Sequence, residues 1–309
     1  MRIVFMGSPD FAVPTLDVLI HSQHEIVTVY SQPPRPSGRG QKVNQTPVHN
    51  LAELNAIPVL TPEKFKEDDI KALKALNPDL IIVVAYGLIL PEGVLNVAPC
   101  INLHPSALPL WRGAAPMNYP VLNGETTTDI CIMEMEKGLD SGPVYLRKSY
   151  SIGCDETAGE LHDRFKLEGA KHMLDVVDNW AQYKNAAQLQ VGETTYAHKF
   201  KSVDLPEIRA LNFSKSAKVL HNQIRGLSPW PGAIFNHEGA EIKVLNSTLS
   251  LLLSEMDIGQ VCAINEGGVH IQTGEGVICL TQLQRAGKRA LPVVEFLKGY
   301  PLKEGDVLS

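Results

Sequence analysis

The stretch Asp79-Leu80-Ile81-Ile82-Val83-Val84-Ala85-Tyr86 decides the fold that the sequence predicts. It is a continuous apolar run without the alternation of polar and apolar positions that a half-exposed strand requires. Such a run is typical of a strand buried on both faces, which is the situation inside a mostly parallel sheet. We therefore expect residues 79–86 to form a central strand of an α/β domain.

The beginning of the chain indicates the same kind of sheet. Residues 2–6 form a short apolar run, the turn Gly7-Ser8-Pro9-Asp10 follows, and a helical pattern then continues to Ile20 before a second strand at residues 25–30. This order is a βαβ unit, which places two parallel strands in one sheet. We expect Ser8 to cap the helix. Because the turn lacks the GxGxxG pattern, a nicotinamide-dependent enzyme is disfavoured.

The next predicted strand carries candidate chemistry at its carboxyl end. It runs into Asn102 and His104, which share one face because side chains two residues apart on a strand point the same way, whereas Leu103 faces the other side. Pro105 and Pro109 stiffen the loop that follows. Open α/β sheets bind ligands at the carboxyl ends of their strands. A histidine here can also be purely structural, but its pairing with an amide makes it a candidate catalytic group.

A further acidic candidate follows a strand predicted at residues 129–135. Asp140 lies in the loop Gly138-Leu139-Asp140-Ser141-Gly142, where the glycines allow the backbone to approach a ligand closely. Taken alone, an aspartate in such a turn is explained equally well by turn geometry. Another strand at residues 144–152 follows, and we expect Asp155 to cap a long amphipathic helix. Its core-facing residues are predicted to be Leu161, Phe165, Met173 and Val176.

The insertion at residues 32–42 is rich in proline and glycine and contains Arg35, Arg39 and Lys42 but no acid. Long loops in compact domains are usually functional or disordered, and this one has the charge to meet a phosphate backbone. A mobile, solvated loop is the alternative interpretation.

The chain is expected to contain two domains, at residues 1–188 and 207–309, joined by a polar, aperiodic linker at 189–206. In the second domain we expect Ser214 to cap a helix ending at Arg225. Five short strands follow, at residues 233–236, 242–245, 260–264, 269–273 and 277–282. The predicted fold class is therefore a Rossmann-like, mostly parallel sheet domain followed by a small OB-like β-barrel domain.

The composition limits the functional classes. A net charge of −6 argues against a protein that holds nucleic acid by bulk electrostatics, although residues 207–309 are neutral and contain the cluster Arg285, Lys288 and Arg289. No apolar run reaches the roughly 18 residues of a membrane helix, and the apolar start is too short for a signal peptide. We expect a cytoplasmic protein and, by default, a monomer. The five cysteines never fall in a CxxC spacing, so neither a disulfide framework nor a zinc cluster is implied.

Taken together, Asn102-x-His104, the run from Pro105 to Pro109, Arg112-Gly113 and the loop around Asp140 resemble the formyltransferases that use 10-formyltetrahydrofolate. The cationic insertion and the second domain make the chain resemble, within that group, the methionyl-tRNA formyltransferases. Ala107 stands where that family usually has leucine, so we expect a smaller contact with the folate at this position.

The resemblance implies a set of roles. Asn102, His104 and Asp140 would be catalytic, with Asp140 lying against His104 and raising its pKa. The folate site would be lined by Ser106, Ala107, Leu108 and Pro109. Arg39 and Lys42 would contact the initiator methionyl-tRNA, and 10-formyltetrahydrofolate would be the co-substrate, with no metal required.

Four alternatives are weighed against this resemblance. A sugar-nucleotide amine formyltransferase and a 10-formyltetrahydrofolate hydrolase would use the same Asn, His and Asp, and the cationic loop is the main feature that distinguishes them from an enzyme acting on tRNA. A glycinamide ribonucleotide transformylase typically lacks the second domain. A non-catalytic RNA-binding α/β protein would have no use for Asn102 beside His104 and should be more basic.

Overall fold

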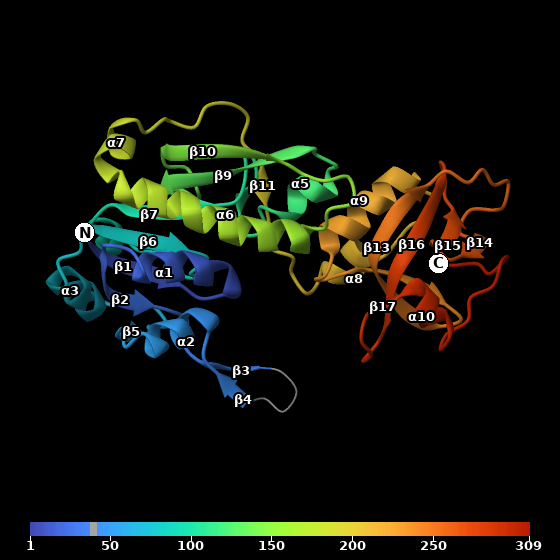
Figure 1. Cartoon of the computed structure of the whole chain (residues 1–309), viewed down its shortest axis with the longest axis horizontal. Helices are drawn as coiled ribbons and strands as arrows, with labels where there is room; N and C mark the ends of the chain where they lie inside the picture. Colours follow the sequence, from blue (N-terminus) through green and yellow to red (C-terminus); the bar gives the residue numbers. More distant parts are fainter. Residues whose placement is uncertain (38–41) are drawn as a thin grey trace. The chain divides into compact units, whose positions relative to one another are not determined.

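The computed structural model describes residues 1–37 and 42–309 and divides into two compact units (Figure 1). The amino-terminal unit consists of residues 1–113, 129–150 and 162–196. The carboxyl-terminal unit consists of residues 114–128, 151–161 and 197–309. Each unit therefore draws on segments that are separated in the sequence. The domain boundaries at residues 188 and 206 stay a prediction.

The amino-terminal unit is built on a seven-stranded sheet (Figure 1). From one edge to the other, its strands are β10 (Val144–Ser151), β9 (Thr127–Glu134), β7 (Cys100–His104), β6 (Leu80–Val84), β1 (Arg2–Gly7), β2 (Glu25–Tyr30) and β5 (Val59–Leu60). All five residues of β6 are buried. The pairs from β7 to β5 are parallel, and β9 runs antiparallel to β7. The prediction of a doubly buried central strand is confirmed.

Helices and short strands complete this part of the chain. The helices are η1 (Asp10–Ala12), α1 (Val13–Ile20), α2 (Pro47–Leu54), α3 (Glu67–Ala75), α4 (Glu92–Leu95), α6 (Ala158–Asp178) and α7 (Trp180–Asn185). Two small two-stranded sheets pair β3 (Arg35–Ser37) with β4 (Lys42–Asn44), and β8 (Arg112–Gly113) with β11 (Tyr196–Ala197).

Two predicted helix caps are wrong in this region. The Ser8 hydroxyl donates to the carbonyl of Tyr86 at 3.0 Å instead of capping the helix, so it ties β1 to the segment after β6. The cap of α6 is Thr157 rather than Asp155, because the Thr157 hydroxyl accepts the Glu160 N–H at 3.2 Å while the Glu160 carboxylate accepts the Thr157 N–H at 2.8 Å. This reciprocal capping box satisfies two backbone donors at once. The predicted core residues of α6 are all buried.

The two faces of β7 have different neighbours. Leu103 packs against α6, where a Cβ at Gly169 would come within 2.7 Å of the Leu103 side chain. Asn102 and His104 lie on the opposite face, paired directly with Met133 and Cys131 of β9. The alternation predicted for this strand is confirmed, and it separates the packing face from the face with candidate chemistry.

The carboxyl-terminal unit contains an antiparallel sheet in the order β12 (Ala233–His237), β13 (Ala240–Ser250), β16 (Val277–Arg285), β15 (Gly268–Gln272), β14 (Val261–Asn265), with β17 (Leu291–Pro292) paired to β16. Its helices are α5 (Asn118–Leu122), α8 (Leu205–Arg209), α9 (Ala217–Leu227) and α10 (Val293–Leu297). One face of α9 enters the core beside the sheet, through residues such as Leu220 and Ile224. The cap of α9 is Ser216, not Ser214, because the Ser216 hydroxyl accepts the Val219 N–H.

The predicted fold class, a mostly parallel sheet domain followed by a small antiparallel β domain of the OB-like type, is confirmed. None of the helices within residues 1–37 and 42–309 has the length and apolar character that crossing a membrane requires.

Candidate active site

His104 is the buried centre of the candidate site. It is only 3% exposed, at the last residue of β7. Its Nε2 atom lies 3.1 Å from the carbonyl oxygen of Trp111, and its Nδ1 atom lies 3.7 Å from Oδ2 of Asp140. Because a carbonyl oxygen can only accept, Nε2 carries a hydrogen. In the neutral ring, Nδ1 therefore presents its lone pair on the side of the Asp140 carboxylate.

The charge of His104 is set mainly by burial. Desolvation lowers the pKa of His104 below its ordinary value, and Arg112 acts in the same direction. The Asp140 carboxylate and the Trp111 carbonyl act against this and raise the pKa. The contribution of Asp140 thus has the predicted sign, but the expectation of a raised pKa is wrong for the net direction because the cost of burying a charge is larger. Burial therefore favours the neutral form of the His104 ring.

Asp140 is held in a backbone conformation that is unusual for a residue with a side chain. Its φ angle is +47°, in the left-handed region, where aspartate is one of the better-tolerated residues. Its Oδ2 atom accepts the backbone N–H of Gly113 at 2.8 Å. The loop after β9 and the loop after β7 are therefore joined by the same carboxylate oxygen that faces His104.

Asn102 is the remaining polar side chain on this face of β7. It is partly exposed, and within the described part of the chain its side-chain amide makes no hydrogen bond to the protein. An amide in that position keeps its N–H groups for a ligand. The predicted proximity of Asn102, His104 and Asp140 therefore corresponds to a buried imidazole facing a partly buried carboxylate, beside one unpaired amide.

The loop predicted to line a folate site folds over the same face. Leu108 packs against Cys131, Met133 and Val144 and is buried. Ser106 is also buried, and its hydroxyl donates to the carbonyl of Leu110 at 2.7 Å. These two side chains shape the loop from within. Ala107 and Pro109 are the partly exposed members of the predicted set, so any direct side-chain contact with a ligand falls mainly to them.

Two further residues, which the sequence interpretation did not select, hold the site together. The side chain of Gln190 accepts two hydrogen bonds from Arg112 and donates to the carbonyls of Asp140 and Gly142. The hydroxyl of Thr195 accepts the Trp111 N–H at 2.9 Å. Both belong to the polar segment that we interpreted as a linker, and nothing in its aperiodic pattern distinguishes them from solvated residues.

The sequence of this chain matches known protein families. Residues 1–177 match the family described as Formyl transferase, and residues 206–301 match Formyl transferase, C-terminal domain. The chain is also 44% identical to methionyl-tRNA formyltransferase from Sinorhizobium medicae, over 98% of this chain and 97% of the relative. The chain belongs to the methionyl-tRNA formyltransferase family.

Solved structures share the fold of this formyltransferase at low sequence identity. HypX from Aquifex aeolicus, solved in complex with tetrahydrofolic acid, aligns with a TM-score of 0.65 at 18% identity, covering all of this chain and 50% of HypX. The chain thus spans about half the length of HypX. An N-formyltransferase from Helicobacter canadensis, in complex with folinic acid and dTDP-3-aminofucose, aligns with a TM-score of 0.64 at 19% identity, covering 91% of this chain and 98% of that one.

The residues predicted to contact tRNA in this formyltransferase are only partly described. Arg39 lies outside the described residues. Lys42 is the first residue of β4, where it pairs with Ser37 of β3. Both predictions therefore remain predictions. Within the described ranges, no group of three His, Cys, Asp or Glu side chains could hold a metal ion.

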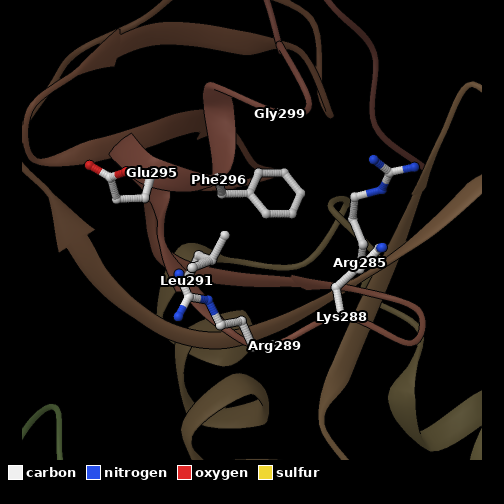
Figure 2. Close-up of a pocket in the computed structure, with 7 residues that line it drawn as sticks. All are labelled: Arg285, Lys288, Arg289, Leu291, Glu295, Phe296 and Gly299. Carbon is white, nitrogen blue, oxygen red and sulfur yellow. The ribbon is translucent and has the colours of Figure 1, made fainter.

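The carboxyl-terminal unit of the formyltransferase has a basic pocket. Figure 2 shows Arg285, Lys288 and Arg289 from the end of β16 and the turn that follows, arranged around Phe296 of α10. The pocket has a volume of about 260 Å³, and Glu295 is the one acidic residue in its lining. The Arg285 guanidinium lies 5.1 Å from the centre of the Tyr300 ring, a cation–π distance. The cationic cluster seen in the sequence is thus gathered on one surface.

Proposed function

We propose that this protein transfers the formyl group of 10-formyltetrahydrofolate to the α-amino group of methionine on initiator methionyl-tRNA, which yields formylmethionyl-tRNA for translation initiation. The observation that carries the proposal is the buried His104 facing the Asp140 carboxylate, beside the unpaired amide of Asn102. The full-length similarity to methionyl-tRNA formyltransferases supports the choice of substrate.

The chemistry requires a base and a proton carrier. The lone pair of the amine forms a bond to the formyl carbon, and the formyl oxygen takes up the displaced electron pair. When the tetrahedral intermediate collapses, the bond from carbon to N10 of the folate breaks and its electrons stay on N10. The amine must lose one proton and N10 must gain one. His104 is the buried titratable group of the site, and we assign it to accept the first proton and to deliver the second.

The role of Asp140 follows from the same geometry. Once His104 has accepted a proton, both ring nitrogens carry hydrogens, and Nδ1 faces the Asp140 carboxylate at 3.7 Å. A negative charge at that distance stabilises the imidazolium that forms during the reaction. Asp140 thus reduces the cost of a charge that burial would otherwise make expensive.

Asn102 is suited to the developing negative charge on the formyl oxygen. Its amide N–H groups are not used within the described protein, so they can donate to that oxygen without breaking another bond. Pre-positioned donors of this kind stabilise tetrahedral intermediates, and the loss of one typically costs about 10² to 10³ in rate.

The two substrates would be held by different segments. We assign the folate to the loop after β7, with Ala107 and Pro109 as the accessible side chains and Ser106 and Leu108 as its buried support. We assign the acceptor end of the tRNA to the cationic loop with Arg39 and Lys42. The neutral charge of residues 207–309, compared with −6 for the whole chain, favours the second domain as a further tRNA-contacting surface.

The alternatives differ in the acceptor. A sugar-nucleotide amine formyltransferase or a formyl-folate hydrolase could use the same three residues, but neither needs a loop with three cations and no acid. A non-catalytic RNA-binding protein does not require a buried imidazole that faces a carboxylate. We further propose that the protein works as a monomer in the cytoplasm, and light scattering after size-exclusion chromatography tests the oligomeric state.

The proposal is tested by incubating the purified protein with 10-formyltetrahydrofolate and methionyl-tRNA charged on the initiator. Hydrolysis of the product and chromatography of the released amino acid should show formylmethionine. Release of formate alone, or formylation of a sugar amine but not of methionyl-tRNA, would overturn the tRNA assignment and favour one of the alternatives.

A further inference from the structure

The segment from Gln188 to Tyr196 crosses both loops that carry the candidate chemistry. Gln188 exchanges two backbone hydrogen bonds with Val144, directly after the Asp140 loop. At the other end, the Thr195 carbonyl accepts the Arg112 N–H at 3.0 Å. This segment therefore spans from the loop after β9 to the loop after β7, and Gln190 lies between these two attachments.

The Gln190 side chain uses both of its polar atoms at this crossing. Its Nε2 donates to the Asp140 carbonyl at 2.9 Å and to the Gly142 carbonyl at 2.8 Å, which uses both amide hydrogens. Its Oε1 accepts from Nε and from a terminal nitrogen of Arg112, at 3.1 and 2.7 Å. These four hydrogen bonds use both N–H donors and both acceptor lone pairs of the side-chain amide. One residue thus joins the loop of Asp140 to the loop that contains Trp111 and Arg112.

The two groups that face His104 are both in strained backbone positions. Asp140 has a φ angle of +47° and Trp111 one of +60°, which is rare for a bulky side chain. Such conformations persist where the surroundings over-determine them. Gln190 holds the Asp140 carbonyl, and Thr195 holds the Trp111 N–H at 2.9 Å. The same short segment therefore fastens both partners of the imidazole.

We infer that Gln190 is a positioning residue of the transfer reaction, which keeps the Asp140 carboxylate against His104 by anchoring the backbone of the Asp140 loop. Gln190 does not touch a reacting atom in this account. It acts through Asp140, with Arg112 fixing the orientation of its amide. The inference rests on the proposed function, because its consequences are measured as the rate of formyl transfer.

The variants Gln190→Ala and Gln190→Glu separate the possible contributions. Glutamate keeps the acceptor for Arg112 but removes both donors to the carbonyls of Asp140 and Gly142. We therefore expect both variants to lower kcat by about tenfold to hundredfold, the range of a misplacement of roughly 1 Å, with little change in KM for the folate. Gln182→Ala, which truncates an exposed glutamine on α7, serves as the matched control.

The pH profile distinguishes positioning from a loss of stability. Asp140 raises the pKa of His104, so an Asp140 loop that has drifted away should shift the acidic inflection of kcat/KM to lower pH in Gln190→Ala, which adds no new charge. If a variant only lowered the fraction of folded enzyme, the rate would fall at every pH and the inflection would not move. An unchanged inflection in Gln190→Ala, or wild-type kcat in Gln190→Glu, would overturn the inference. If the wild-type protein does not formylate methionyl-tRNA, the proposed function fails instead.

Discussion

Nδ1 of His104 lies 3.7 Å from Oδ2 of Asp140, too far for a hydrogen bond but close enough for the carboxylate to act on the charge of the ring. The distance has a structural origin, because the same oxygen is already bonded to the Gly113 N–H at 2.8 Å. Asp140 therefore both closes the loop after β7 and supports a charge on the imidazole.

Replacement of His104 by alanine should lower turnover by about 10² to 10⁴, the usual contribution of a positioned acid–base group. Steady-state formylation of methionyl-tRNA measures the effect. His21→Ala is the control, since that side chain is 70% exposed on the surface. Circular dichroism and the melting temperature establish that the variant is folded. Near-normal turnover in a folded His104→Ala protein would remove His104 from the mechanism.

Substitution of Asp140 by asparagine should separate charge from geometry. Asparagine also tolerates positive φ and can still accept the Gly113 N–H, so the loop keeps its shape. The lost carboxylate should shift the acidic inflection of kcat/KM to lower pH and reduce kcat at least about tenfold. Asp17→Asn on α1, whose carboxylate is exposed, is the matched control. An inflection that moves to higher pH would contradict the role given to Asp140.

The stability of the protein should fall between about pH 7 and pH 5. Burial lowers the pKa of His104, His172, His221 and His270. A lowered pKa means that the unfolded chain binds protons first as the pH decreases through about 6.5. The stabilising contribution is thus present above that pH and is lost below it. Urea unfolding at several pH values measures this. A free energy of unfolding that rises toward pH 5 would show that these histidines are not buried in the neutral form.

Arg39→Ala and Lys42→Ala should raise KM for methionyl-tRNA and leave the slow hydrolysis of formyl-folate unchanged. Loss of a phosphate contact should also make the salt dependence of tRNA binding less steep. Lys74→Ala, an exposed lysine on α3, is the control for the loss of one positive charge. If hydrolysis slows to the same degree as transfer, the loop supports the folate site rather than the tRNA.

Strands and their faces were the part of the molecule that could be predicted best from the sequence. The uninterrupted apolar run of β6 and the alternation from Ile101 to His104 depend on burial patterns that the sequence carries directly. Helix starts were predicted a few residues away from their observed positions, because serine, threonine and aspartate all cap helices. Thr157 and Ser216, rather than Asp155 and Ser214, make the capping bonds.

The candidate site was predictable only in its polar centre. Asn102 and His104 stand out because they are polar residues in an otherwise apolar strand. Asp140 stands out because it is an acid in a loop that contains two glycines. Gln190 and Thr195 act through contacts with residues about 50 to 80 positions away, and no local pattern encodes such contacts. The net pKa direction of His104 could not be predicted either, since it depends on how completely the folded loops exclude water.

The most direct measurement is single-turnover formylation of initiator and elongator methionyl-tRNA side by side, with 10-formyltetrahydrofolate as the donor. The account predicts rapid formation of formylmethionyl-tRNA on the initiator, with much slower reaction on the elongator. Formate release without formylation of either tRNA would contradict it.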